Sequence, residues 1–230
     1  DETLRIAQEL YEKKLVTYPR TDARVLSTAV AKEIGKNIRG LTQIPGVKWA
    51  AEEILNQNRH QGLAKTRYVN DKQITDHYAI IPTGQGISGL SRLPRQSVQV
   101  YERIVRRFLS IFFPGAVYEK ISIEMTIREE HFFASVRVLA EEGYLKVAGA
   151  GKKQDQEDCK NPALFEALKK LKKGMALPVE KLEIREGETT PPKRYTSGSM
   201  ILAMENAGQL IEDEDLRAQI KGSGIGTSAT

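Results

Sequence analysis

The sequence predicts an α+β protein, because its apolar residues recur first at a helical period and later at a strand period. Helical spacing dominates residues 1–114, and alternation dominates residues 115–189. A helical pattern returns in residues 190–230, which begin at a Thr-Pro-Pro step. With 230 residues, 40% of them hydrophobic and 28% charged, the chain is large enough to bury a core in one large domain or two to three small ones.

Three apolar stripes define expected helices in the first region. They are Leu4, Ala7, Leu10 and Tyr11; Val47, Ala50, Ala51, Ile54 and Leu55; and Tyr101, Ile104, Val105, Phe108, Leu109 and Phe112. A further helix is expected from Ser27 or Thr28, either of which can cap it, to about Arg39, with Gly40 beyond its end. Residues 15–18, which precede a proline, are expected to be extended.

The second region carries a hairpin pattern. Two apolar rows alternate with other residues on either side of a short connection: Ile121, Ile123, Met125 and Ile127, then Phe132, Ala134, Val136 and Val138. This alternation predicts a β-hairpin with one buried face. Further strands are expected at 144–147 and 179–184, an exposed loop at 149–163, and a short helix from Leu164 to Leu171.

The third region is expected to contain a helix at Ser197–Asn206 that Gly208 ends. Asp213 and Asp215 suit the positive end of a second helix, and a glycine-rich run at 222–226 follows.

Charge and cysteine usage narrow the function classes. The formal net charge of +5 suits a polyanionic partner without requiring one. Arg103, Arg106 and Arg107 lie off the neighbouring apolar stripe, where they are either solvated or face phosphates. The lone Cys159 excludes an internal disulfide or a cysteine zinc site, and it favours a reducing cytosolic environment. No apolar run approaches the ~20 residues that a membrane span needs.

The first cluster with chemical potential is LVTYPRTD, residues 15–22. Tyr18, Arg20, Thr21 and Asp22 place a phenol, a guanidinium, a hydroxyl and a carboxylate within five residues. Tyrosine can form a covalent intermediate as a nucleophile, and an arginine two residues later in extended chain lies on the same face, where it can bind a phosphate. The alternative is a structural tyrosine, buried with its hydroxyl hydrogen-bonded, beside a surface arginine.

Two further clusters follow. DHYAIIPTGQG at 76–86 brings His77, one of three histidines, into an apolar stretch; such a histidine is either catalytic or structural. PPKRYTSGSM at 191–200 places Lys193, Arg194 and Thr196 before a helix whose N-terminus suits phosphate, although an ordinary capped helix fits equally. The patterns GxxxxGK[ST], HExxH and GxSxG are absent from the sequence.

These three clusters, in this order, resemble the signatures of type IA DNA topoisomerases. LVTYPRTDARVLS at 15–27 resembles the active-site signature, DHYAIIPT at 76–83 the second, and PPKRYTSGSMILAMENAG at 191–208 with GIGTSAT at 224–230 the third. The stretch 209–227 is similar to the topoisomerase III branch. Ala23 replaces a usual serine, and Tyr78 replaces a usual histidine or glutamate.

The resemblance implies a division into three domains. Residues 1–115 would form a mainly helical, winged-helix-like domain that carries the tyrosine and is truncated at its N-terminus. Residues 116–189 would form the β-rich arch of the toroid. Residues 190–230 would begin the helical DNA-binding base domain, truncated at the C-terminus.

The resemblance also implies roles. Tyr18 would cut one DNA strand, forming a 5′-phosphotyrosine, and would reseal it without ATP after strand passage. Arg20 and His77 would assist catalysis. The DNA-binding residues would be Thr21, Asp22, Lys193, Arg194 and Thr196.

The family's Toprim domain, which supplies the Mg²⁺ ligands, has no counterpart in this sequence. We therefore expect no metal ligands in this chain, which alone should be inactive in cleavage, and Mg²⁺ only in the full-length enzyme. Single-stranded DNA is the expected partner of a monomeric, cytoplasmic, nucleoid-associated bacterial protein. Two alternatives stay open: a single-stranded DNA-binding module without catalysis, and a purely structural scaffold.

Overall fold

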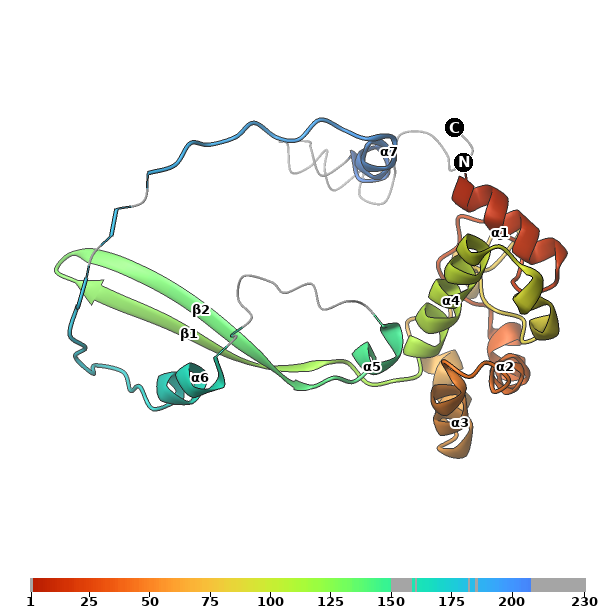
Figure 1. Ribbon diagram of the computed structural model, residues 1–230, viewed down its shortest axis with the longest axis horizontal. Coiled ribbons are helices and arrows are strands. Elements are labelled where there is room, and N and C mark those ends of the chain that lie inside the picture. Colours follow the sequence, from red (N-terminus) through yellow and green to blue (C-terminus); the bar gives the residue numbers. More distant parts are fainter. Residues whose placement is uncertain (1, 150–158, 160, 182, 185, 208–230) are drawn as a thin grey trace. The chain divides into compact units, whose positions relative to one another are not determined.

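The computed structural model describes residues 2–149, 159, 161–181, 183–184 and 186–207. The chain divides into two compact units, Asp1–Met175 and Ala176–Thr230, and each is described by itself. The helices and strands, drawn in Figure 1, are α1 (Glu2–Glu12), α2 (Thr28–Leu41), α3 (Lys48–Asn56), η1 (Arg59–Lys65), η2 (Asp71–Gln73), η3 (Ile87–Arg92), α4 (Arg95–Ser110), β1 (Val117–Ile127), β2 (Glu130–Glu141), α5 (Leu145–Ala148), α6 (Pro162–Lys169) and α7 (Ser197–Glu205). This composition confirms the predicted α+β class.

The core of the first unit lies among the helices that precede the strands. Helix α2 packs on α3, α1 packs on α4, and α4 packs on α5. The side chains with no exposed surface in this core are Leu10, Leu15, Ile34, Ile38, Leu41, Ala50, Ala51, Ile54 and Leu109. Burial of one leucine or isoleucine contributes about 1.5–3 kcal/mol, so this cluster is the main source of stability for the helices.

Two of the predicted stripes are confirmed and one is wrong in part. Those of α3 and α4 face the core as expected. In α1 the buried residues are Ile6, Ala7 and Leu10, whereas Leu4 and Tyr11 are exposed. The face of α1 that packs on the core is therefore centred on Ile6, Ala7 and Leu10 and differs from the predicted face. Leu4 and Tyr11 lie on the exposed side of the helix, next to the candidate site described below.

Helix α2 begins as predicted and ends later than predicted. The Ser27 hydroxyl accepts a hydrogen bond from the Val30 N–H at 3.2 Å, which caps the helix. Gly40 lies inside α2 rather than beyond it. A Cβ at Gly40 would lie 2.0 Å from the carbonyl oxygen of Gly84, so this glycine permits two backbones to pack closely instead of ending a helix.

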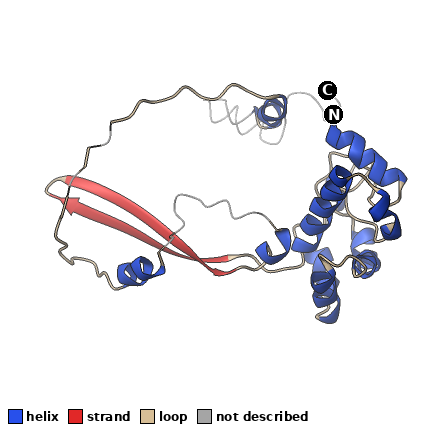
Figure 2. Cartoon of the chain, in the orientation of Figure 1, coloured by secondary structure: helices blue, strands red, loops and turns tan. Residues whose placement is uncertain are grey.

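The predicted hairpin is confirmed, with the register that the alternation requires. Ile121 pairs with Val136 and Met125 with Phe132, and the two-residue connection starts with Arg128 in the left-handed region at φ 56°. The expected buried face is only half-buried: no residue of β1 or β2 is fully buried, and Met125 and Phe132 are about 40% exposed. In the described residues this hairpin is the only sheet, as Figure 2 shows, and helix α6 packs on β2.

Both further predicted strands are wrong. Residues 145–148 form the short helix α5, because Val147 inserts into the helical core and its carbonyl accepts a hydrogen bond from the Arg106 guanidinium at 3.1 Å. Residues 179–181, 183 and 184 form no strand, and Ile184 is exposed. An extended segment becomes a strand only when another strand satisfies its backbone groups, and the described residues of the second unit contain no other strand.

The two later helices are confirmed. Helix α6 begins after Asn161, whose side-chain oxygen accepts hydrogen bonds from the N–H groups of Ala163 and Leu164. Helix α7 forms the second unit's described helix. The expected helix near residue 213, the glycine run at 222–226 and most of the 149–163 loop lie outside the described residues. No helix among the residues described is long and apolar enough to cross a membrane.

Candidate active site

The segment that carries Tyr18 is fastened to the segment that carries His77. The Thr17 N–H donates to the Ile81 carbonyl at 3.0 Å, and the Thr83 N–H donates to the Leu15 carbonyl at 3.0 Å. The Thr17 hydroxyl accepts from the Ile81 N–H at 3.0 Å and donates to the Ala79 carbonyl at 3.3 Å. Two extended segments that are far apart in sequence therefore lie side by side, and the side chains of Leu15, Val16 and Ile81 in them are buried.

This pairing brings the predicted tyrosine and histidine into contact. The ring centroids of Tyr18 and His77 are 4.4 Å apart, with an interplanar angle of 39°. The Thr21 hydroxyl donates to the His77 carbonyl at 3.0 Å and accepts from the Ala23 N–H at 3.1 Å, which fixes the turn after Tyr18. The Thr21 side chain thus links the backbone after Tyr18 to the backbone at His77.

Tyr11 is a neighbour of Tyr18 that the sequence did not reveal. Its ring meets the Tyr18 ring edge-on, with centroids 5.3 Å apart and an interplanar angle of 84°. The helical spacing of α1 placed Tyr11 in the core stripe, but it is exposed and supports the Tyr18 ring. Only the fold, which lays the loop after α1 back on that helix, could identify this contact.

The Tyr18 side chain is half-buried, and no hydrogen bond from its hydroxyl is present among the described residues. This disagrees with the alternative of a buried tyrosine with a satisfied hydroxyl. Tyr101 gives the contrast: its hydroxyl is buried without a partner, and burial raises its pKa to about 12. A phenol in that setting resists ionisation, whereas Tyr18 lies where solvent or a substrate can reach it.

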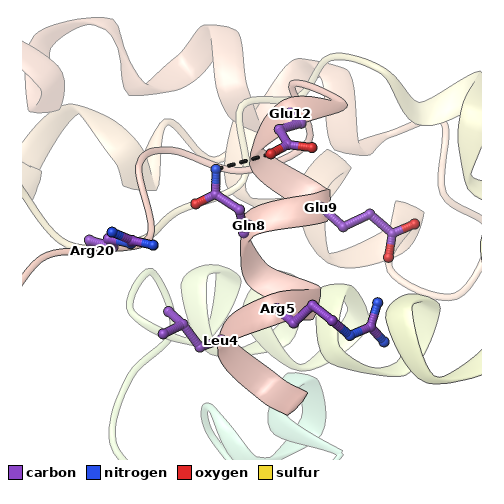
Figure 3. A pocket seen from close by; sticks show the side chains of 6 residues that line it. All are labelled: Leu4, Arg5, Gln8, Glu9, Glu12 and Arg20. Carbon is purple, nitrogen blue, oxygen red and sulfur yellow. Dashed lines mark hydrogen bonds between the residues drawn. The ribbon is translucent and has the colours of Figure 1, made fainter. Parts of the chain in front are cut away.

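Arg20 lies on the wall of an open cavity of about 510 Å³ beside α1. Figure 3 shows its side chain pointing toward the side of the helix that carries Gln8. The other lining residues are Leu4, Arg5, Gln8, Glu9 and Glu12. Gln8 donates to Glu12 at 3.1 Å, and Ser97 donates to Glu9 at 3.0 Å, so both carboxylates have partners. Arg20 has no ion pair within the described residues and can bind an incoming anion.

Of the remaining predicted residues, one is in the same segment as Tyr18 and three are in the second unit. Asp22 is exposed in the turn after Tyr18. Lys193, Arg194 and Thr196 belong to the second unit, where the first two are exposed. The Thr196 hydroxyl accepts from the Ser199 N–H at 3.2 Å, and the Thr196 N–H donates to the Ser199 hydroxyl at 2.8 Å, so Thr196 caps α7.

No metal site is formed by the residues that the structure describes. Nowhere in that part of the chain do three His, Cys, Asp or Glu side chains gather closely enough to bind an ion. Asp22 is the one carboxylate of the LVTYPRTD cluster, and a single carboxylate does not fit Mg²⁺, which prefers several oxygen ligands.

Comparison with known proteins identifies the family of the chain. A family model described as DNA topoisomerase matches residues 1–230. DNA topoisomerase 3 of Bacillus licheniformis is 34% identical over 233 residues, which cover 100% of this chain and 31% of that protein. DNA topoisomerase 3 of Shouchella clausii is 36% identical over 235 residues, covering 100% of this chain and 30% of the relative.

The Salmonella typhimurium DNA topoisomerase 3 is 34% identical over 230 residues, which cover 99% of this chain and 33% of that protein. The chain thus spans about a third of the length of these relatives. Together with the family match over residues 1–230, these likenesses show that the chain belongs to the DNA topoisomerase family and resembles topoisomerase 3 proteins in particular.

Proposed function

We propose that this chain is the tyrosine-bearing part of a type IA topoisomerase of the topoisomerase III kind, which changes DNA topology by cutting and resealing one strand. The observation that carries the proposal is the contact between Tyr18 and His77, made by two family signatures that the fold places side by side. Family membership over the whole chain supports the same reaction.

In the proposed reaction, the Tyr18 hydroxyl oxygen attacks the phosphorus of a phosphodiester in single-stranded DNA. The new bond joins Tyr18 to the 5′-phosphate, the bond to the 3′-oxygen breaks, and that oxygen takes a proton to leave as a 3′-hydroxyl. The reverse attack by the 3′-hydroxyl reseals the strand. The phosphotyrosine retains the energy of the phosphodiester, so the cycle needs no ATP.

The neighbouring residues have distinct proposed roles. Arg20, exposed and without an ion pair in the described part of the chain, would neutralise charge on the scissile phosphate. His77, in ring contact with Tyr18, would donate a hydrogen bond or carry the proton near the phosphate. Lys193, Arg194, Thr196, Thr21 and Asp22 would contact the DNA backbone.

Mg²⁺ would be supplied to the full-length enzyme by a Toprim domain elsewhere in the parent chain, because the donor set here does not fit it. We therefore propose that this chain alone does not cleave DNA. The parent would act as a cytoplasmic, nucleoid-associated monomer. A single-stranded DNA-binding module is the second candidate, and it applies to this chain in isolation because the chain spans about a third of its relatives.

The test is formation of a covalent adduct between the full-length parent and a 3′-labelled single-stranded oligonucleotide with Mg²⁺. The wild type should yield a labelled protein band, and Tyr18→Phe should yield none while it still binds DNA. Tyr11→Phe is the matched control, because it removes the adjacent phenol and should keep the adduct. Arg20→Ala and His77→Ala should slow cleavage by roughly 10²-fold or more without abolishing it.

An adduct that persists in Tyr18→Phe would remove Tyr18 from the chemistry. The absence of any adduct in a folded, DNA-binding wild type would leave the second candidate in place.

A further inference from the structure

A second groove, about 310 Å³ in volume, lies in the first unit and is lined in part by residues that follow Thr21 and His77 in the chain. Its buried lining comes from Leu26, Ile81 and Phe108, each no more than 5% exposed. The half-buried ring of Tyr68 lies on one wall. This volume is at the low end of the range for small-ligand sites, roughly 300–1,000 Å³, so it suits a single planar group rather than a duplex.

Arginines surround this apolar base. Arg24, Arg103 and Arg107 line the groove, and none of its lining residues within the described chain is acidic. Within the same described part, Arg103 and Arg107 make no hydrogen bond or ion pair, in contrast to Arg106, which pairs with Glu102 at 2.7 Å. Two guanidinium groups without protein partners therefore stand beside an apolar slot.

A fourth cation lies at the wall. The Arg67 guanidinium is 5.3 Å from the centroid of the Tyr68 ring and donates to the Tyr68 hydroxyl at 3.4 Å. This hydrogen bond raises the pKa of Arg67, and an arginine is charged at all working pH values even without it. The groove is complementary to a ligand that combines an aromatic plane with negative charge.

The groove is lined by two chain segments that also contribute to the candidate active site, those after Thr21 and after His77. The Ala79 N–H donates to the Val25 carbonyl at 2.9 Å, and the Leu26 N–H donates to the Tyr68 carbonyl at 2.8 Å, which joins three extended segments into its wall. Ala79 follows His77 by two residues, and an extended chain advances at most about 3.6 Å per residue. The lining of the groove thus begins, at Ala79, within about 7 Å of His77.

We infer that this groove binds an unstacked nucleotide of single-stranded DNA next to the cleavage site, with the base on the apolar floor and Tyr68, and the flanking phosphates on Arg103 and Arg107. The inference rests on the proposed function for the identity of the strand. Stacking of a base on an aromatic side chain together with cationic contacts to phosphate is the usual way in which proteins hold single strands. The groove would set where the strand lies relative to Tyr18.

The experiment uses the full-length parent, binding of a fluorescent single-stranded oligonucleotide, and a series of salt concentrations. The variant Arg103→Ala/Arg107→Ala should bind at least several-fold more weakly at moderate salt. Each lost phosphate contact lowers the slope of log K against log salt by ~0.7, so the slope should fall by about 1.4. Arg92→Ala/Arg95→Ala removes the same charge from exposed positions outside the groove and should retain the wild-type slope.

A second arm replaces single nucleotides of the oligonucleotide by abasic sites. In the wild type, one position close to the cleaved bond should lose affinity by roughly five- to hundred-fold, and Tyr68→Ala should remove this sensitivity. Groove variants with the same affinity and slope as the control would overturn the inference. So would a lower melting temperature of the arginine variant with unchanged DNA binding, which would mean that another part of the parent covers the groove.

Adduct formation with saturating oligonucleotide separates this inference from the proposed function. If the wild type forms no adduct, the proposed function fails whatever the groove binds. If it forms an adduct and the groove variants bind DNA normally, only the groove inference fails.

Discussion

Two tyrosines of this chain differ in ways that their residue type cannot reveal. Tyr18 is half-buried, in contact with two aromatic rings, and without a hydrogen bond from its hydroxyl in the described residues. Tyr101 is buried in the core, and its hydroxyl also has no partner there. The environment of the ring therefore decides whether the phenol is available for chemistry or only fills space.

The buried phenol makes stability depend on alkaline pH. Burial raises the pKa of Tyr101 from 10.0 to about 12, so between these two pH values the neutral phenol is favoured in the folded state and the phenolate in the unfolded state. Its contribution is fully present below pH 10 and is lost as the pH rises to about 12. Tyr101→Phe should leave stability near neutrality unchanged or higher, because it removes an unsatisfied hydroxyl, and should reduce the alkaline loss. Urea unfolding at pH 8 and near pH 11 tests this, and parallel losses in the two proteins would contradict it.

Gly40 is the second residue whose role depends on its surroundings. Gly40→Ala should cost about 1–3 kcal/mol or more, because its Cβ would collide with the backbone of Gly84. Since Gly84 follows the His77 segment, adduct formation by the full-length parent should slow as well. Gly62→Ala is the control, because nothing lies within 4 Å of its Cβ position. Urea unfolding of the three proteins gives the comparison, and equal stability would show that α2 and Gly84 do not pack in solution.

At the scale of elements, the start of α2 is held by a carboxylate as well as by Ser27. Asp71 accepts hydrogen bonds from the Thr28 hydroxyl at 2.6 Å and the Thr28 N–H at 2.8 Å. Both hydrogen bonds lower the pKa of Asp71 below its ordinary value, and the bond from the Thr28 hydroxyl has the larger effect. They tie η2 to the positive end of α2.

This cap should give an acid-dependent contribution to stability. A carboxylate with a lowered pKa stabilises the fold above its unfolded pKa, and the contribution is lost as the pH falls through the folded pKa. Asp71→Asn should therefore lower the melting temperature near pH 7, and the difference from wild type should shrink near pH 2. Asp76→Asn, at an exposed carboxylate without a bond in the described residues, is the control. A difference from wild type that does not change with pH would reject a charged cap.

The elements that sequence could predict are those fixed by local signals. The Ser27 cap, the stripe of α4 and the alternation of the hairpin depend on spacing within one element, and each is confirmed. The prediction of a strand at 144–147 is wrong because Val147 is buried in the helical core, where residues 145–148 form α5. The prediction that Gly40 lies beyond the end of α2 is wrong because this glycine packs against Gly84, which is far away in the sequence.

The residues of the candidate site also fall into those that the sequence predicts and those that only the fold identifies. Tyr18 and His77 were predicted from signatures, since nothing in their spacing indicates that they touch. Tyr11, the threonine bonds at Thr17, and the Arg103 and Arg107 groove required the fold, because each joins segments that the sequence separates.

At the scale of the whole molecule, the chain spans about a third of the length of its relatives and forms two compact units. The first contains the tyrosine site, the arginine groove and the hairpin, and the second contains α7 and the basic residues before it. The boundaries 1–115, 116–189 and 190–230, with the winged-helix-like and arch assignments, stay predictions. Among the described residues of 116–189, the β content is the single hairpin.

The pairing of residues 15–17 with 79–83 has a consequence for synthesis of the protein. Closing a loop of this length costs conformational entropy that only the finished packing offsets, so we expect the contact between Tyr18 and His77 to form late in folding. A ribosome that has translated Tyr18 must still add the segment through Thr83 before the site can exist. A nascent chain that lacks this segment thus carries the Tyr18 ring without its contact to His77.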